Sequence, residues 1–370
     1  MANLYHYICL LLLLQSSSLA SAFESPKVFY DNSNNIELVN KEASIHVINV
    51  GQGDATLIKC PNGKFTLIDF GSNKKPVQGI SSSIQYIKDQ LDMNNPIIEN
   101  LIITHSDIDH YNKIAKLLDQ NITFNNILLG GNIKGYKNKK GLYKKGAEWI
   151  KNSNVTFLQS SYSSKHKKQG FYNDSKWNGT ISCHGIFNNG ISKNSSPLDF
   201  FILIANYTKI ANTTSIVILT RYQTKNMNTP IYTYLTGDAM NATENKIMEI
   251  YSGNKEKTIN LLKLGHHGSI TSSSVEWIKW VNPTISFVSA KQRGSWKHPN
   301  CDVVQRLGID ITLNIENGYS SYCVENKTKK IHEYKSSKLF STTPSLSGKN
   351  NRKLGVNYKI TMKDNSVSIE

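Results

Sequence analysis

The chain has 370 residues, and 43 lysines and arginines against 27 aspartates and glutamates give a formal net charge of +16. This length suits one large domain or two smaller ones and excludes a chain too short to bury its own core. The excess of positive charge suits polyanionic partners such as nucleic acid, teichoic acids or anionic membrane surfaces, although solubility alone also explains it.

The first 22 residues have the pattern of a secretory signal peptide. An apolar run at 8–14 precedes polar serines and the sequence Ala20-Ser21-Ala22, after which cleavage is expected, although no lysine or arginine precedes the run. The run is much shorter than the roughly 20 residues that a membrane-spanning helix needs. No later segment reaches that length, so we expect a secreted or periplasmic protein with no stable membrane span.

From residue 44 onwards the pattern is one of short strands, tight turns and a few helices. Strands are expected at 45–50, 55–60, 65–69, 97–103, 200–204, 214–219, 231–235, 259–264 and 284–289. Helices are expected at 80–93, 112–120, 242–251 and 272–281. Strands dominate with helices between them, which favours an α/β sandwich formed by one domain at 44–335.

Two segments depart from this pattern. Between 130 and 170, ten lysines and several aromatic residues stand against one acid, Glu148. Such a basic insertion, at 134–168, can hold a nucleic-acid strand through phosphate contacts and base stacking, but it is more often a solvated loop. The segment 336–370 is predicted to be a Ser/Thr-rich tail in which 356–362 pairs as an edge strand.

Four cysteines remain after the signal peptide and allow two disulfides with three alternative pairings in an oxidising compartment. They are Cys60, Cys183, Cys301 and Cys323.

The densest group of metal-binding side chains is the sequence THSDIDH at 104–110. His105 and Asp107 point to one side if the chain is extended, and Asp109 and His110 follow where it turns toward a helix. Imidazole and carboxylate groups are ligands for Zn²⁺ and Mn²⁺. Taken alone, this loop is equally well interpreted as a polar surface loop.

Two later loops strengthen the metal interpretation because they also follow predicted strands. They are Thr236-Gly237-Asp238 and the sequence GHHGS at 265–269. Loops at strand ends are where functional groups collect. We expect Asp238 to bridge two metal ions, His266 to complete the second site, and Asp69 to orient a ligand from behind.

Five motifs occur in the order found in the metallo-β-lactamase superfamily: GQGD at 51–54, LIDFG at 67–71, THSDIDH, TGD and GHHGS, with His298-Pro299 downstream. The set most resembles the soluble hydrolase domain of the competence protein ComEC. The resemblance implies an αββα sandwich and a hydrolase that holds a divalent metal, Zn²⁺ or Mn²⁺, as two ions. The implied ligands are His105, Asp107, Asp109, His110, Asp238 and His266, while His267 is either a ligand or a contact to the transition state.

Two departures from the superfamily pattern affect this interpretation. Asp107 replaces the second histidine of the commoner loop, which favours Mn²⁺ more than an all-histidine site does and points away from a β-lactamase. The usual mid-chain histidine ligand has no obvious counterpart. His184 and His166 are weak candidates for it, because each is more often a surface or core histidine.

The implied chemistry is hydrolysis by water whose pKa a divalent metal lowers to about 7, so that no serine or cysteine nucleophile is needed. Asp109 is expected to accept the proton. His298, with Lys297 and Arg293, is expected to bind a phosphate, although a basic surface loop explains these residues equally well.

The leading hypothesis is therefore a secreted metal-dependent phosphodiesterase or nuclease that acts on DNA or on a cell-wall phosphodiester. The alternatives are a phosphocholine esterase or other small-ester hydrolase, a β-lactamase, and a non-catalytic protein that binds nucleic acid through the basic insertion. No protein partner is inferred.

Overall fold

The computed structural model describes residues 42–73, 76, 78–91, 94, 96–131, 136, 153–157, 180–187, 196–208, 212–224, 227–251, 258–291, 298–313, 315, 317–343 and 355–370. The expected signal peptide at 1–22 and nearly all of the expected basic insertion at 134–168 lie outside these residues. Within the described ranges, no helix combines the length and the apolar character needed to cross a membrane.

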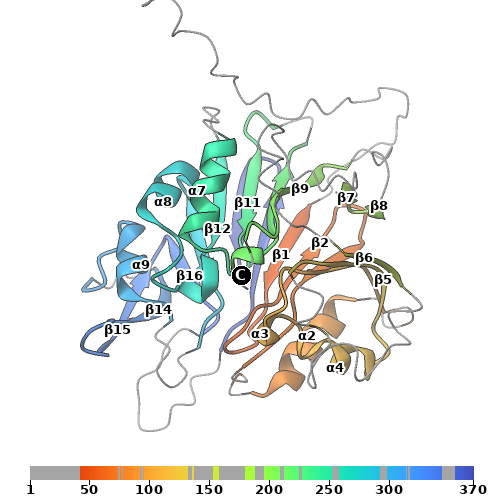
Figure 1. Ribbon diagram of the computed structural model, residues 1–370, viewed down its shortest axis with the longest axis horizontal. Helices are drawn as coiled ribbons and strands as arrows, with labels where there is room; N and C mark the ends of the chain where they lie inside the picture. Colours follow the sequence, from red (N-terminus) through yellow and green to blue (C-terminus); the bar gives the residue numbers. More distant parts are fainter. Residues whose placement is uncertain are drawn as a thin grey trace, which may run out of the picture.

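The first of two large sheets contains eight strands (Figure 1). They are β1 (Ala43–Val47), β2 (Thr56–Lys59), β3 (Phe65–Ile68), β4 (Ile97–Ile103), β5 (Thr123–Leu129), β6 (Asn154–Phe157), β17 (Tyr358–Lys363) and β18 (Ser366–Ile369). Their order across the sheet is β18-β17-β1-β2-β3-β4-β5-β6. β3, β4, β5 and β6 run parallel, so their carboxyl ends meet at one edge.

The second sheet also contains eight strands and repeats this plan. They are β7 (Thr180–Ser182), β8 (Gly185–Phe187), β9 (Leu198–Ile204), β10 (Val217–Tyr222), β11 (Ile231–Leu235), β12 (Ile259–Lys263), β13 (Ile285–Val288) and β16 (Leu339–Ser341). Their order is β16-β13-β12-β11-β10-β9-β7-β8, and β11, β12, β13 and β16 run parallel.

Helices cover the outer face of each sheet, as the two groups of coiled ribbons in Figure 1 show. Beside the first sheet lie α2 (Ile80–Gln90), α3 (Ile108–Tyr111) and α4 (Ile114–Leu118). Beside the second lie α7 (Asn241–Ile250), α8 (Val275–Val281) and α9 (Cys301–Arg306). Two 3-10 turns, η3 (Asn212–Thr214) and η4 (Gly265–Gly268), and a hairpin of β14 (Tyr319–Val324) with β15 (Ile331–Ser336) complete the described elements.

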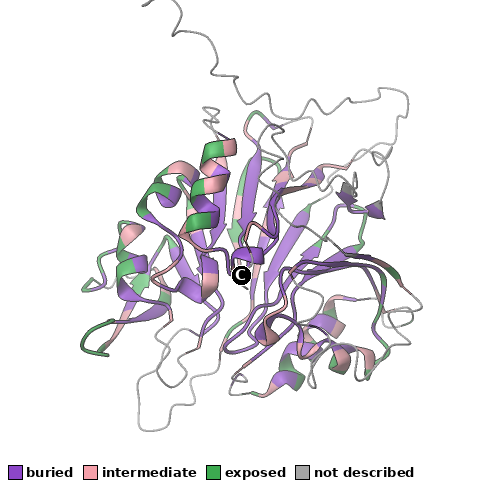
Figure 2. Cartoon of the chain, viewed as in Figure 1, coloured by how far each residue is buried: buried purple, intermediate pink, exposed green. Residues whose placement is uncertain are grey.

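Three clusters of buried apolar side chains correspond to the three interfaces between these layers. The strands of both sheets are coloured mostly as buried in Figure 2, whereas the helices also carry exposed positions. The central cluster joins the sheets, with Ile102 of the first and Ile218 of the second. Leu101 and Ile103, which flank Ile102 in β4, belong instead to the cluster under α2 and α4. Side chains alternate between the faces of a strand, so a strand covered on both sides carries apolar residues at successive positions, as at 101–103. The expected αββα sandwich is confirmed.

The segment 336–370 contributes to both sheets and does not form a separate tail. β16 pairs with β13 in the second sheet, and β17 lies between β1 and β18 in the first. Ile360 and Met362 of β17 are fully buried in the central cluster. The strand expected at 356–362 is therefore an interior strand, and β18 forms the edge.

Two disulfides resolve the pairing that the sequence left open. Cys60 after β2 is bonded to Cys183 in the turn between β7 and β8, across 123 residues, and this bond joins the first sheet to the second. Cys301, the first residue of α9, is bonded to Cys323 of β14, across 22 residues.

Candidate metal centre

The loop 104–110 leaves β4 at the edge where the parallel strands end. Asp107 lies at the N-cap of α3 in extended backbone, and the short helix then turns Asp109 and His110 inward. His105 and His110 are fully buried, and Asp109 is 5% exposed. The Asp107 side chain is 40% exposed, with Oδ2 3.5 Å from His105 Nε2. All four residues of the sequence motif therefore lie together, with Asp107 nearest to solvent.

Asp69, at the end of β3, holds His110 in one orientation. His110 Nδ1 lies 2.7 Å from Asp69 Oδ2, and the same carboxylate accepts hydrogen bonds from the backbone N–H and the hydroxyl of Thr104. His110 Nε2 is left facing Asp238, 3.2 Å from its Oδ1. This is the arrangement expected of a residue that orients a metal ligand from behind.

The second sheet supplies the remaining side chains from two turns. Asp238 follows β11, and its backbone N–H donates to Ser215 Oγ just after η3. His266 and His267 follow β12 in η4, both in left-handed backbone with φ of 48° and 55°. Residues other than glycine seldom adopt this conformation, and where they do the strain is often associated with function.

The two adjacent histidines have different surroundings. His267 is 1% exposed, its Nδ1 donates to the Ser289 carbonyl at 2.9 Å, and its Nε2 lies 3.6 Å from Asp109 Oδ2. The His266 side chain is 21% exposed, and its Nε2 lies 3.1 Å from Asn212 Nδ2. His267 thus faces the Asp109 side of the centre, and His266 faces the more open side.

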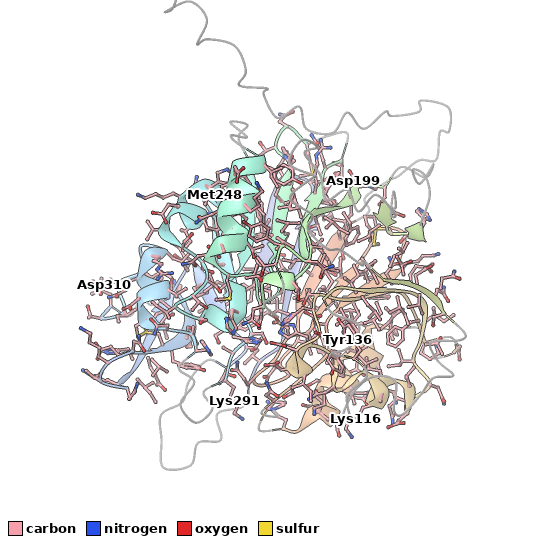
Figure 3. All side chains as sticks on the ribbon, in the orientation of Figure 1. Lys116, Tyr136, Asp199, Met248, Lys291 and Asp310 are labelled. Atoms are coloured by element: carbon pink, nitrogen blue, oxygen red, sulfur yellow. A yellow bond between two sulfur atoms is a disulfide. The ribbon has the colours of Figure 1, made fainter. Side chains whose placement is uncertain are left out.

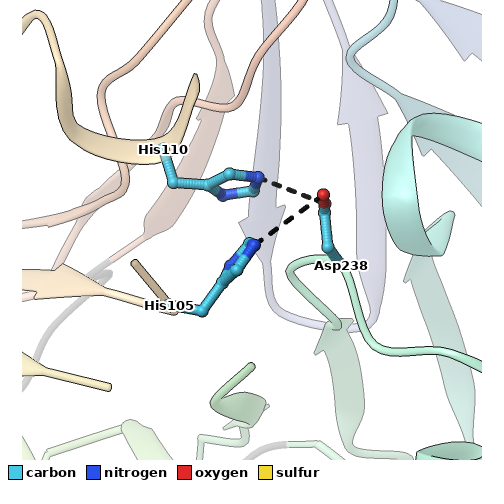
Figure 4. A group of neighbouring side chains, drawn as sticks. All are labelled: His105, His110 and Asp238. Atoms are coloured by element: carbon cyan, nitrogen blue, oxygen red, sulfur yellow. Dashed lines mark ion pairs between the residues drawn. The ribbon is translucent and has the colours of Figure 1, made fainter. Parts of the chain in front are cut away.

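Asp238 is the point at which both halves of the centre converge. Its carboxylate lies 3.2 Å from His110 Nε2, 3.5 Å from His267 Nε2, 3.9 Å from His266 Nε2 and 4.0 Å from His105 Nε2. Figure 4 shows the two histidines of the first sheet pointing at this one carboxylate. A carboxylate with imidazoles on several sides is in position to share a divalent cation with them.

The buried polar atoms of the centre show that the residues fit a metal. The Nε2 atoms of His105, His110 and His267 and Oδ1 of Asp238 are buried without a hydrogen-bond partner. Buried polar atoms nearly always have partners, so four unsatisfied atoms at one point need an explanation. Two groups, His105 with His110 and Asp238, and Asp54 with Asp238 and His267, have ligand atoms within 4.8 Å of one another. These donors suit a divalent cation.

The electrostatics of the metal-free centre agree with this fit. Burial opposes protonation of His267, but the Asp238 carboxylate and the contact with Asp109 outweigh it and raise the pKa of the imidazole to about 9. Burial also opposes protonation of His110, but the Asp238 and Asp69 carboxylates outweigh it and raise the pKa of His110 well above its ordinary value. Burial also opposes ionisation of Asp238, yet the surrounding imidazoles lower its pKa well below the ordinary value. The carboxylates of the centre thus favour positive charge at the positions of the imidazoles, as a cation site requires.

His298 lies beside the two histidines of η4. Its ring centroid is 5.6 Å from that of His266 and 6.5 Å from that of His267. Burial, with the positive charge of the neighbouring imidazoles, lowers the pKa of His298 to about 3. Tyr322 on β14 donates a hydrogen bond to the His298 carbonyl at 2.9 Å. The expected partners Lys297 and Arg293 lie outside the described residues.

The two weak candidates for a mid-chain ligand do not join the described centre. His184 lies in the turn between β7 and β8, and it belongs to none of the metal-binding groups found among the described residues. His166 lies outside the part of the chain that the structure describes.

Four further residues at the centre were not assigned a role from sequence. Asp54 contacts His110, and Lys263 contacts Asp54. Ser215 lies 3.3 Å from His105 Nδ1, and Asn212 contacts His266. Asp54 was visible within the GQGD motif, but nothing in the sequence distinguished Ser215 or Asn212 from other polar residues beside a strand.

Comparison with known proteins gives two groups of similarities. No protein-family model matches the chain. Recombination protein 2 of Haemophilus influenzae is 28% identical over 267 residues, which is 71% of this chain and 26% of that protein. ComE operon protein 3 of Bacillus subtilis is 30% identical over 103 residues, which is 27% of this chain and 13% of that protein. The resemblance to the competence proteins is confirmed.

The chain spans about a quarter of the length of the first of these two relatives and less of the second. Among solved structures, the metallo-β-lactamase fold protein YhfI from Bacillus subtilis is 10% identical, with 86% of this chain and 99% of that chain covered and a TM-score of 0.40.

Proposed function

We propose that the chain is an exported metal-dependent hydrolase that cleaves phosphodiesters. The observation that supports this most directly is the Asp238 carboxylate, which imidazoles from both sheets approach with their unsatisfied Nε2 atoms. In a protein that binds no metal, buried imidazole nitrogens without hydrogen-bond partners would only destabilise the fold.

Two groups of residues that meet at Asp238 would hold the metal. His267 and Asp109, with His110, would hold it on the deeper side, because His267 Nε2 lies 3.6 Å from Asp109 Oδ2 and 3.5 Å from Asp238 Oδ2, and His110 Nε2 lies 3.2 Å from Asp238 Oδ1. His105 and Asp107 would hold it on the outer side, with His266 on the open side. In this assignment His267 takes the place at the second site that the sequence analysis gave to His266.

When bound, divalent metals supply Lewis acidity and water that ionises near neutral pH. The chain's own groups then have separate tasks. Asp238 is available as a ligand, because in the metal-free protein the surrounding imidazoles hold its pKa well below the ordinary value. Asp109, with Oδ2 3.6 Å from His267 Nε2, is in position to accept a proton from water. His298, whose ring lies 5.6 Å from that of His266 and 6.5 Å from that of His267, is near enough to the centre to contact a substrate oxygen.

Nucleic acid is the substrate class that we favour. The names of the two relatives refer to recombination and to the ComE operon. The net charge of +16 suits a polyanion of any kind, so it does not separate DNA from a cell-wall phosphodiester. Export is supported by the signal-peptide pattern and by two disulfides, which persist in oxidising compartments.

The test uses residues 23–370 purified without metal and then supplied with Mn²⁺ or Zn²⁺. We expect cleavage of single- or double-stranded DNA and of bis(p-nitrophenyl) phosphate, and loss of both activities with EDTA. A substrate panel that also contains a phosphocholine ester and a β-lactam distinguishes the alternatives. DNA that is retained but never cut under any metal would establish a binding protein instead.

A further inference from the structure

Lys263, the last residue of β12, is the one lysine or arginine of the described residues that is buried. Its residue exposure is only 4%. A charged group removed from water is costly unless it is paired and hydrogen-bonded. The position of Lys263 therefore needs a reason, and the metal centre described above does not itself require an ammonium group.

The Lys263 ammonium group joins turns from both sheets. Its Nζ lies 2.7 Å from Asp54 Oδ2 in the GQGD turn of the first sheet. It also donates to the carbonyl of Gly237, at 3.0 Å, and to that of Leu264, at 3.4 Å. Gly237 precedes Asp238, and Leu264 leads into η4. One side chain thus connects the turn that holds Asp54 with both turns that supply ligands from the second sheet.

Asp54 lies within the centre rather than beside it. It is 2% exposed, its Oδ2 lies 3.9 Å from His110 Nδ1, and it forms a potential metal-binding group with Asp238 and His267. Asp69 and Asp109 are also buried nearby and contact His110 and His267. Like charges packed in a low-dielectric interior repel strongly, so a fixed cation at this point lowers the energy of the arrangement.

We propose that Lys263 is a positioning residue that serves as a resident counter-ion of the metal centre. It balances Asp54 and holds the Gly237–Asp238 turn in place before metal binds, and it limits the positive charge that the centre then accepts. The inference depends on the metal binding in the proposed function but not on the substrate or the reaction.

The test is a double-mutant cycle of Lys263→Met, Asp54→Asn and both together in the chain from residue 23. Melting temperature is measured with and without Mn²⁺, and Mn²⁺ affinity by titration calorimetry. We expect Lys263→Met to lower the melting temperature of the metal-free protein much more than that of the Mn²⁺-loaded protein. Removing one positive charge near the cations should tighten Mn²⁺ binding by about tenfold, from the Coulomb energy at an intermediate dielectric.

The other variants should move the affinity in defined directions. Asp54→Asn removes a negative charge and should weaken Mn²⁺ binding by about tenfold. The double variant restores the net charge, so its Mn²⁺ affinity should return to within about threefold of the parent's. If Lys263→Met alone does not fold, the double variant tests the proposed counter-ion role instead. Lys116→Met on α4, labelled in Figure 3, is an exposed control with the same charge change and should leave the affinity unaltered.

A purely structural role for Lys263 predicts a different result. Equal losses of melting temperature with and without Mn²⁺, or weaker Mn²⁺ binding in Lys263→Met, would overturn the proposal. A parent protein that binds neither Mn²⁺ nor Zn²⁺ would instead refute the proposed function, so the two failures are distinguishable.

Discussion

The two sheets contribute to the metal centre in different ways. From the first sheet come four candidate ligands within six consecutive residues, on one loop whose orientation is fixed by Asp69 and Thr104. From the second come Asp238, His266 and His267 on two separate turns, with two residues in left-handed backbone. The first half of the centre is a local motif, whereas the second half is brought together by the pairing of β11 with β12 and of β12 with β13.

Substitution of Asp238 should have the largest effect of the changes proposed, since both halves of the centre converge on this residue. Asp238→Asn keeps the size of the side chain but removes the charge that the imidazoles face. We expect loss of hydrolysis by about ten-thousandfold, on the scale seen when a group that acts together with others is removed. Metal analysis of the purified protein should show loss of at least one ion. Glu249→Gln, a charge removal at an exposed position of α7, is the control.

The disulfide between Cys60 and Cys183 tests how strongly the two halves depend on each other. Replacing both cysteines by serine reopens a loop of 123 residues. The chain-entropy relation gives a loss of about 5 kcal/mol in unfolding free energy, to be measured by denaturant titration. The Cys301–Cys323 pair closes 22 residues, for which the same relation gives about 3 kcal/mol. The reverse order of effects would show that the first bond does not tie the sheets together.

Substitution of the residues that hydrogen-bond the histidines should have a smaller effect, on metal affinity, and it compares the two halves of the centre directly. In Asp69→Asn, His110 keeps a hydrogen-bond partner but loses the carboxylate that fixes its orientation. We expect metal affinity to fall by roughly 10- to 100-fold, as for other residues that orient metal ligands. His267 donates its hydrogen bond to the backbone carbonyl of Ser289. A Ser289→Ala substitution leaves this carbonyl in place, so that variant should retain the metal affinity of the parent. Equal losses in both variants would contradict the asymmetry.

The pH dependence of the metal-free protein gives the smallest effect. The pKa of His267 is raised to about 9 in the folded state, against an ordinary value of 6.5. Its protonation therefore stabilises the fold fully below about pH 6.5, and this contribution is lost as the pH rises toward 9. We expect the melting temperature to fall by a few degrees over that range, and saturating Mn²⁺ to remove most of the dependence. A melting temperature that rises between pH 6.5 and 9 would contradict this sign.

The parts of the fold that were predicted well are those buried on both faces. The strands at 97–103 and 231–235 match β4 and β11, because short runs rich in isoleucine, leucine and tyrosine between turns have few alternatives. The hairpin of β14 and β15 was missed, since it is polar and stands apart from the two large sheets. The segment 336–370 was mistaken for a tail because its Ser/Thr content hid the buried positions Ile360 and Met362.

The same physical distinction applies to the metal centre. The first half could be predicted because its ligands are neighbours in sequence. The strand expected at 214–219 begins instead at Val217, after the η3 turn that brings Asn212 and Ser215 to His266 and His105. Nothing in the sequence distinguished Lys263 from other residues of the strand expected at 259–264, because only the fold brings Asp54 into contact with it. Contacts between distant turns depend on register and packing, which no local pattern encodes.

Asp238 is approached by side chains from both sheets, and this has a thermodynamic consequence. Opening either half separates ligands of the same ions, so partial unfolding and complete unfolding both release the metal. Binding energy is then linked to the cooperative transition of the whole domain, and an ion at a hundred times its dissociation constant adds about 2.7 kcal/mol to it. If the centre binds metal as proposed, scarcity of the metal would expose the entire domain to proteolysis, and its abundance would protect regions far from the histidines.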